Sequence, residues 1–268
     1  MSILLRGSDT LRDVPLQEQG ISFQPVVPSR YFRWQHLLDR LVAIVLLFPT
    51  LLAIGVLGLL VRLTSRGPAI YSQRRVGLNG KHFTMYKLRT MRHDAERATG
   101  PVWSLPGDPR ITLIGRFLRA LHLDELPQIL NVFLGDMALV GPRPERPDIA
   151  VQLVKQIPNF LERLRVKPGV TGLAQVNLPP DTDVASVRRK LVLDLDYVES
   201  ASLSLDLRIL LCTSLRAFGF RGRWFSGLLG IKRHGLPASS SVGPPTSAVD
   251  LQATTNPNGK VHKKAIPK

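Results

Sequence analysis

Hydrophobic residues concentrate in one long segment near the start of the chain. From Leu41 to Val61, about 21 residues follow one another without a charge, long enough for a helix to cross the roughly 30 Å hydrocarbon core of a bilayer. The segment begins some 40 residues into the chain and no small-residue cleavage pattern follows it, so it is not a cleavable signal peptide. The pattern therefore predicts contact with a membrane.

Three arrangements of this segment are open on the residues alone. Pro49 removes a backbone donor near the middle, and Gly55 and Gly58 loosen the second half, so a bent, re-entrant helix is favoured. Arginines flank both ends, and positive charge usually marks the cytoplasmic side, which fits a segment that returns to its starting side. A simple spanning helix and a fully buried core helix are the alternatives.

After this apolar segment, the hydrophobic and polar residues alternate over short runs. From Arg62 to about Phe220 the chain mixes short strand-like runs with amphipathic helices and turn signals. Asn79-Gly80 joins two β-rich runs and predicts a hairpin, whereas residues 184–200, "VASVRRKLVLDLDYVES", predict an amphipathic helix. The predicted fold class is α/β in the broad sense, α+β and mostly helical, with a re-entrant N-terminal membrane helix, a compact cytosolic domain and a small β-hairpin.

Four segments follow from these patterns: a flexible leader at 1–30, a re-entrant membrane helix at 31–63, a globular domain at 64–220 and a basic, disordered tail at 221–268. The leader is polar and contains three prolines. From Gly219 onward the tail has eight Lys and Arg against one acid and is rich in Ser, Pro, Thr and Gly.

The charge and the cysteine content indicate which partners the protein can have and whether it forms disulfides. A formal net charge of +16 and a pI near 10.9 favour polyanionic neighbours. Nucleic acid is not expected among them, because the basic residues surround an apolar segment and a tail without any nucleic-acid motif. The single cysteine, Cys212, lies in an apolar run and is expected to be a small buried hydrophobe, so no disulfide framework forms.

Two adjacent carboxylates are the main chemical feature. Asp124 and Glu125 stand just before Pro127, and proline is tolerated in the first turn of a helix. Asp124 is therefore a candidate N-cap, with "ELPQILNVFL" as the helix that it opens, and its pKa should be low. The same helix end suits a phosphate, and Glu125 can offer oxygen to a hard cation such as Mg²⁺.

Arginines that could bind phosphate lie on both sides of this pair in the sequence. Arg116 and Arg119 precede it, and Arg143 follows in "GDMALVGPRPERP", where Pro142 and Pro144 predict a stiff, extended loop. On spacing alone, a helix cap beside surface arginines explains the same residues. Asp194 and Asp196 in "LDLDYV" are expected to be structural.

Taken together, four consecutive blocks resemble the bacterial sugar transferase family. They are "SRGPAIYSQRRVGLNGKHFTMYKLRTM", "DPRITLIGRFLRALHLDELPQILNVFLGDMALVGPRPE", "RVKPGVTGLAQVN" and "LVLDLDYVESASLSLDLRILLCT". This family comprises monotopic phosphoglycosyl transferases, which move a sugar-1-phosphate from a nucleotide diphosphate sugar onto polyprenyl phosphate. The resemblance covers roughly Leu38 to Thr213. It implies an enzyme for the first membrane step of exopolysaccharide or glycoconjugate synthesis.

The resemblance also implies roles for individual residues. Asp124 of "LDELPQ" would be the nucleophile that forms a phosphoaspartyl intermediate with loss of UMP, and Glu125 would bind Mg²⁺. Arg143 of "VGPRP" and Arg119 would contact phosphate or substrate. Lys87 and Arg89 of "YKLRTM" match family positions too, and we assign them to the same role, the alternative being a solvated strand face.

The expected surroundings follow from the same resemblance. The donor would be a UDP-sugar, the acceptor undecaprenyl or another polyprenyl phosphate, and the location an anionic bacterial inner membrane with the catalytic domain facing the cytoplasm. A homo-oligomer and downstream glycosyltransferases are further possible partners. The competing hypothesis is a non-catalytic homologue of the same fold that serves as a scaffold for glycan assembly.

Overall fold

The computed structural model describes residues 30–95, 107–157, 159–217, 227 and 229–231. All of them belong to one unit, Met1–His234. The predicted leader, apart from Arg30, and nearly all of the predicted tail lie outside the described residues. The described elements, in order, are α2 (Arg30–Thr64), β1 (Ile70–Val76), η1 (Leu78–Gly80), β2 (His82–Leu88), α3 (Leu113–Ala120), η2 (Leu123–Glu125), α4 (Gln128–Leu134), β3 (Ala138–Val140), α5 (Pro147–Gln156), η3 (Phe160–Arg165), β4 (Gly169–Thr171), α6 (Leu173–Asn177), α7 (Val184–Ser200) and α8 (Leu203–Ala217).

Two local predictions are confirmed. β1 and β2 form an antiparallel hairpin, and at its turn Asn79 and Gly80 have φ angles of 52° and 73°. Positive φ at two successive turn residues favours Asn-Gly, which explains why this dipeptide fixes the hairpin. α7 spans the predicted residues and begins with a capping box in which Asp183 and Ser186 exchange hydrogen bonds. The mostly helical fold with one small hairpin is thus the one expected.

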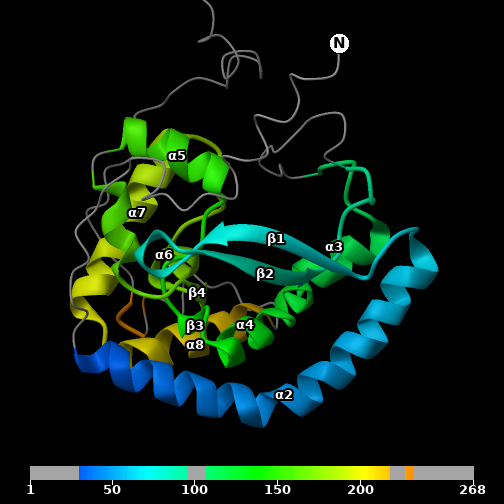
Figure 1. Ribbon diagram of the computed structural model, residues 1–268, viewed down its shortest axis with the longest axis horizontal. Coiled ribbons are helices and arrows are strands. Elements are labelled where there is room, and N and C mark those ends of the chain that lie inside the picture. Colours follow the sequence, from blue (N-terminus) through cyan, green and yellow to red (C-terminus); the bar gives the residue numbers. More distant parts are fainter. Residues whose placement is uncertain (1–29, 96–106, 158, 218–226, 228, 232–268) are drawn as a thin grey trace, which may run out of the picture. The chain divides into compact units, whose positions relative to one another are not determined.

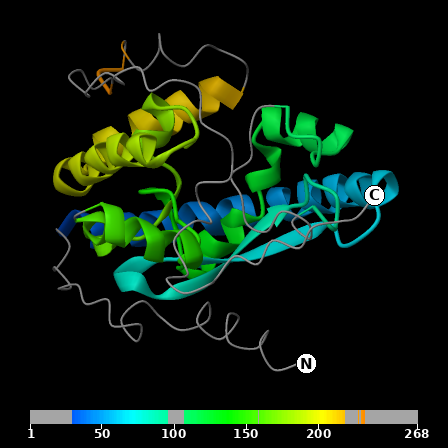
Figure 2. The same ribbon diagram turned by 90° about the horizontal axis from the view of Figure 1, so that it is seen from above.

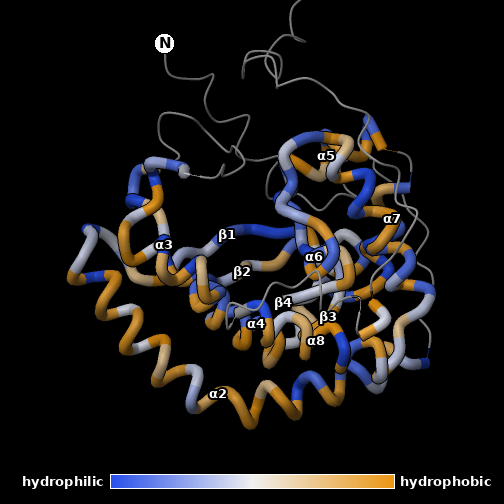
Figure 3. The backbone as a smooth tube through the Cα atoms, turned by 180° about the vertical axis from the view of Figure 1, so that it is seen from behind, coloured by the Kyte–Doolittle hydropathy of each residue, from blue (hydrophilic) through white to orange (hydrophobic). Residues whose placement is uncertain are grey.

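The apolar segment forms one continuous helix, α2, that curves along the domain without turning back at Pro49 (Figure 1). It is long and apolar enough to cross a membrane, and hydrophobic residues dominate its middle (Figure 3). The outward face of α2 is not covered by other described elements: Phe48 is 80% exposed and Leu63 is 73% exposed. A fully buried core helix is therefore excluded.

The inward face of α2 contributes to three hydrophobic clusters in succession. Its start adds Phe32 to a cluster with residues of α7 and α8, its middle adds Ala43 beside the hairpin and α4, and its end adds Val61 against β2 and α3. Burying a valine or phenylalanine side chain contributes about 1.5–3 kcal/mol. Both ends of α2 are therefore fixed to the same domain.

A short parallel ladder, β3 with β4, lies at the centre of the domain, with the hairpin on one side and α7 and α8 on the other (Figure 2). α2 also holds this ladder through polar contacts: Gln35 Nε2 donates to the Val140 carbonyl at 3.0 Å, and Asp39 Oδ2 accepts from the Leu139 N–H at 3.1 Å. Beyond β3 the backbones of Gly141 and Gly169 approach so closely that a Cβ on Gly169 would collide with the Gly141 nitrogen. Glycine is required there because no side chain fits.

Candidate active site

The acidic pair lies in the single 3-10 turn η2 rather than at the N-cap of a helix. α4 starts only at Gln128, and its N-cap is Pro127. The N-cap of η2 is His122, which is left-handed with φ 57°. The predicted capping role of Asp124 is therefore wrong, because the 3-10 turn continues toward α4 without leaving Asp124 at a helix start.

Glu125 binds two cations that come from distant parts of the chain. Lys87 Nζ on β2 lies 2.7 Å from its Oε1, and Arg143 Nη2 lies 2.6 Å from the same oxygen. Burial alone would raise the pKa of this carboxyl, but the charges of Arg143 and Lys87 outweigh it and hold the pKa well below its usual range. Glu125 is therefore ionised at any ordinary pH.

Asp124, its neighbour, has the opposite shift. It is 9% exposed, and burial raises its pKa, with Lys87 opposing and Glu125 adding to the rise. The expected low pKa is thus contradicted, because desolvation outweighs the nearby cations. An ionised Asp124 is poorly solvated, which makes it a stronger nucleophile than an aspartate in water.

The structure brings Arg119 to the edge of the site. Its Nε donates to Thr90 Oγ1 at 2.9 Å. Burial lowers its pKa, while Asp124 and Asp108 act in the opposite direction, so its guanidinium lies within electrostatic reach of both acids. Arg119 thus extends the cationic surroundings that Lys87 and Arg143 provide around the acidic pair.

Arg89 is placed elsewhere. Its Nη1 donates to the Arg66 carbonyl at 2.6 Å and its Nη2 to the Ser65 carbonyl at 2.9 Å. It is 5% exposed, so it lies neither on a solvated strand face nor beside Glu125. Arg89 satisfies backbone carbonyls just after the end of α2, where helices leave such groups unpaired.

Arg143 stands in a loop, residues 141–145, that is held almost entirely through its carbonyls. Pro142 and Pro144 have no N–H to donate, so the carbonyls are the groups by which the rest of the domain can fix the backbone. Four successive ones accept hydrogen bonds from three segments, β4, η3 and β1: Pro142 from the Gly169 N–H (3.0 Å), Arg143 from Arg163 Nη2 (2.7 Å), Pro144 from Arg75 Nη1 (3.0 Å) and Glu145 from the Val76 N–H (2.9 Å).

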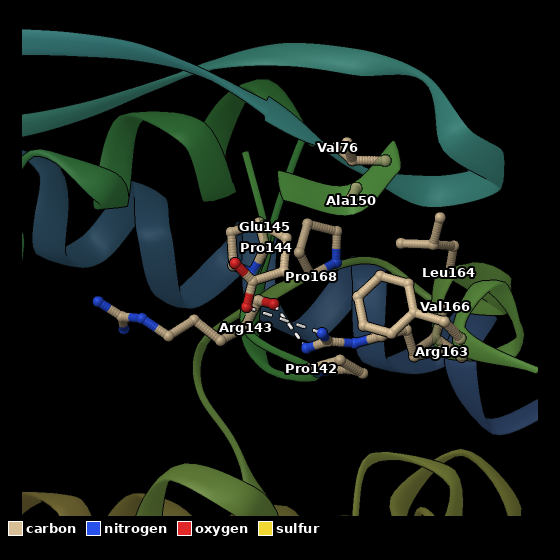
Figure 4. A pocket seen from close by; sticks show the side chains of 11 residues that line it. Val76, Pro142, Arg143, Pro144, Glu145, Ala150, Arg163, Leu164, Val166 and Pro168 are labelled. Carbon is tan, nitrogen blue, oxygen red and sulfur yellow. Dashed lines mark hydrogen bonds and ion pairs between the residues drawn. The ribbon is translucent and has the colours of Figure 1, made fainter. Parts of the chain in front are cut away.

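The space behind this loop is filled by side chains. Figure 4 shows Arg163, Leu164 and Val166 lining it, and the cavity of about 10 Å³ that remains holds no more than a water molecule. A substrate cannot enter there. The side of the loop that a substrate could reach is therefore the opposite one, where the Arg143 side chain meets Glu125.

A Mg²⁺ ion fits the acidic pair as part of a shared site. No group of three or more His, Cys, Asp or Glu occurs among the described residues, so these residues form no cage for a metal. Mg²⁺ usually takes one or two protein carboxylates, with substrate phosphates and waters completing its shell. The oxygens of Glu125 and Asp124 meet that requirement, since Glu125 is always ionised.

Sequence reasoning missed Arg163 and the partners of Lys87. Arg163 is the same residue type as its half-buried neighbour Arg165, but it lies three residues after Phe160, which is buried. That spacing is a usable signal of a buried helical face. The Lys87–Glu125 contact spans 38 residues, and no local pattern indicates it.

The fold and the site define a class: an α+β protein with one long apolar helix and a buried acidic pair among cations. A model of the bacterial sugar transferase family matches residues 30–219, so the chain belongs to this family, as the sequence blocks indicated.

Three curated relatives illustrate the similarity. The UDP-glucose:undecaprenyl-phosphate glucose-1-phosphate transferase of Xanthomonas campestris pv. campestris is 41% identical over 68% of this chain and 38% of its own length. The UDP-N-acetylgalactosamine-undecaprenyl-phosphate N-acetylgalactosaminephosphotransferase of Aeromonas hydrophila is 38% identical over 70% and 44%. The exopolysaccharide production protein PSS of Rhizobium leguminosarum bv. phaseoli is 39% identical over 65% and 88%. The chain thus spans less than half of the first two relatives.

Proposed function

We propose that this protein transfers a sugar-1-phosphate from a UDP-sugar to polyprenyl phosphate, with Asp124 as the nucleophile. The observation that carries the proposal is the buried Asp124 carboxylate beside a Glu125 that already holds Lys87 and Arg143. The names of the relatives, which act on undecaprenyl phosphate, support the same reaction class.

The reaction has two balanced steps. A carboxylate oxygen of Asp124 attacks the phosphorus that bears the sugar, and the bond from that phosphorus to the bridging oxygen breaks, so that UMP leaves with the electron pair. An oxygen of polyprenyl phosphate then attacks the same phosphorus, and the Asp124 carboxylate is released. Splitting the displacement this way means that the two bulky phosphates need not occupy the site together.

Charge at the site suits this chemistry. Lys87, Arg119 and Arg143 bring three positive charges against the two of Asp124 and Glu125, which leaves one in excess for an anionic diphosphate. The arginine fork of Arg143 matches phosphate oxygens. Mg²⁺, bound by Glu125 and the substrate phosphates, would neutralise the diphosphate further.

The membrane arrangement that we propose is re-entrant. Both ends of α2 pack against the same domain, through Phe32 at its start and Val61 at its end, which supports an arrangement with both ends on one side of the bilayer. The exposed apolar face between them would enter one leaflet and return. The catalytic domain would then lie on the cytoplasmic face of the inner membrane, where it meets both substrates.

The acceptor phosphate has a candidate position at the end of α2. A cavity of about 470 Å³ lies between the end of α2 and the start of α3, with Arg92 and Arg116 in its lining beside Asp108. A lipid that moves along the apolar face of α2 would bring its phosphate to these arginines. Asp108 in this lining and the nucleophile Asp124 both act electrostatically on Arg119.

The experiment that tests the proposal measures UMP release. Purified protein in nanodiscs is given Mg²⁺, polyprenyl phosphate and a panel of UDP-sugars, beside an Asp124→Asn variant, and mass spectrometry looks for a sugar-phosphate adduct on the peptide that contains Asp124. UMP from one donor, absent in the variant, is expected. No UMP from folded, membrane-bound protein with any donor would favour the scaffold hypothesis instead.

The topology has its own test. In a Cys212→Ser background, single cysteines replace the exposed Arg33 or Arg66 at the two ends of α2. An impermeant thiol reagent added to sealed inverted membrane vesicles should label both. Labelling of one end only, with the other reached after the bilayer is opened, would establish a spanning helix.

A further inference from the structure

Arg163 is a buried arginine that touches the Arg143 loop from behind. It comes from η3, is 4% exposed, and its guanidinium stacks over the Phe160 ring at 5.2 Å. Its Nη2 donates to the Arg143 carbonyl at 2.7 Å. Of the four groups that hold the loop carbonyls, Arg163 is the one that binds the peptide of Arg143 itself.

Two carboxylates hold Arg163 in place. Asp194 Oδ2 on α7 lies 2.8 Å from Nη2 and Glu145 Oε1 lies 3.8 Å from Nη1. The Asp194 contact is an ion pair without hydrogen-bond geometry, since Asp194 Oδ2 has no hydrogen-bond partner among the described residues. An arginine without such charges could not remain buried, so Asp194 is needed for Arg163 to reach the loop.

The direction of the Arg143 side chain follows from this contact. Figure 4 shows the Arg143 side chain leaving the loop away from Arg163, while the carbonyl of the same residue faces Arg163. With the carbonyl fixed on one side, the side chain extends toward the other, where its Nη2 reaches Glu125 at 2.6 Å. Pro142 and Pro144 restrict the neighbouring φ angles and so limit other orientations.

We propose that Arg163, fixed by Asp194, is a positioning residue that sets Arg143 for phosphate binding. The inference rests on the proposed function for the role of Arg143, and it assigns Arg163 no contact with substrate. It explains why the chain buries Arg163 and Asp194, with Glu145 nearby, next to a cavity too small for a ligand: the cluster supports the Arg143 loop.

The test is a double-mutant cycle between Arg163→Gln and Arg143→Gln, with two readouts. Turnover is followed as UMP release, and binding is followed by calorimetry with UDP. Because Arg163 acts through Arg143, we expect Arg163→Gln to raise the KM for the donor and the Kd for UDP roughly tenfold, and to add almost nothing once Arg143 is already Gln. Arg163→Lys should recover only part of the loss, since lysine lacks the planar fork.

Matched variants keep the test decisive. Arg165→Gln changes an arginine two residues away that pairs with Glu162 and has a 27% exposed side chain; it should leave KM and Kd within twofold. If Arg163→Gln does not fold, Asp194→Asn keeps the side-chain size and should give a smaller rise, which again vanishes in the Arg143→Gln background. Additive losses, or unchanged UDP binding in folded Arg163→Gln, would overturn the proposal.

The two readouts separate this inference from the proposed reaction. UDP binding without UMP release from any donor would refute the proposed reaction, while the cycle on Kd still decides the role of Arg163. Turnover that is lost in Asp124→Asn but insensitive to Arg163 would support the reaction and refute the positioning role.

Discussion

Two ion-pair clusters lie on opposite sides of the Arg143 loop and differ in their charge balance. In front, one acid, Glu125, meets two cations at 2.6 and 2.7 Å. Behind, one cation, Arg163, meets two acids at 2.8 and 3.8 Å, beside a cavity of about 10 Å³. Similar contacts thus differ in what they leave available: the front cluster has one positive charge in excess, which the proposed function assigns to a phosphate, whereas the charge of Arg163 in the rear cluster is matched by acids while it holds the loop.

The clusters also treat their acids differently. The pKa of Asp194, in the rear, is raised to about 6 because burial outweighs Arg163. In front, the pKa of Glu125 is depressed because Arg143 and Lys87 outweigh burial. Glu125, which has two cations in contact, thus stays ionised. Asp194, which shares one buried arginine with Glu145, is protonated more easily.

The largest expected effect is on Asp124, which stands beside the front cluster without a short ion pair to it among the described contacts. Asp124→Asn should lower UMP release by at least about 10³-fold, since no nucleophile remains. Its pKa is raised by burial, so its ionised form costs stability at neutral pH. The melting temperature of the variant should therefore be unchanged or higher, and a clear fall would contradict this account.

Glu125→Gln should lower both activity and stability. Activity should fall about 10²-fold, because Arg143 and Lys87 lose their common partner and no longer present a fixed surface. The depressed pKa of Glu125 means that its ionised form stabilises the fold above the unfolded pKa. The loss should be about 1.5–3 kcal/mol in the free energy of unfolding, measured by urea denaturation. Equal stability of Glu125→Gln and Asp124→Asn would contradict the opposite effects that we assign to the two ionised carboxylates.

The pH dependence of turnover should report on Asp124. The Asp124 carboxylate must be ionised to attack, so kcat/KM should fall about tenfold per pH unit on the acid side of its pKa. Because burial raises that pKa, the fall should begin at a pH above about 3.9, the usual aspartate pKa. Arg143 lowers this pKa, so Arg143→Gln should move the limb to higher pH. A limb that stays in place would mean that another group titrates.

The smallest expected effect on activity concerns Arg89. This arginine resembles Arg163 in binding backbone carbonyls, here those of Ser65 and Arg66. Arg89→Lys should leave the KM for the donor within about twofold, while the melting temperature falls because a planar fork is lost. A tenfold rise in KM with unchanged stability would instead support the phosphate-binding role that the family resemblance implies for Arg89.

How far the sequence predicts this molecule depends on how local the signal is. The Asn79-Gly80 hairpin and α7 follow from neighbouring residues, and the structure confirms both. Buried Cys212 was expected from its apolar surroundings. The family motifs predicted the family correctly, because they combine several distant segments in a fixed order, and the chemical roles that they imply stay predictions.

The remaining errors have a common physical origin in tertiary contacts. Asp124 was expected to cap a helix and to have a low pKa, but burial by other elements reverses the sign. Arg89 and Lys87 are two residues apart on one segment, yet one supports the end of α2 and the other Glu125. Spacing does not distinguish them, because the partners lie 23 to 38 residues away.

Under the proposed re-entrant arrangement, the hydrogen bonds between α2 and β3, donated by Gln35 and accepted by Asp39, would make the bilayer a mechanical component of catalysis. The strand that leads into the Arg143 loop is held on one side by β4 and on the other by a helix whose outer face is apolar and exposed. Hydrocarbon thickness or a detergent that changes the curve of α2 would then act on that strand directly. The rate of the enzyme should therefore vary with lipid chain length even when every substrate-binding side chain is intact.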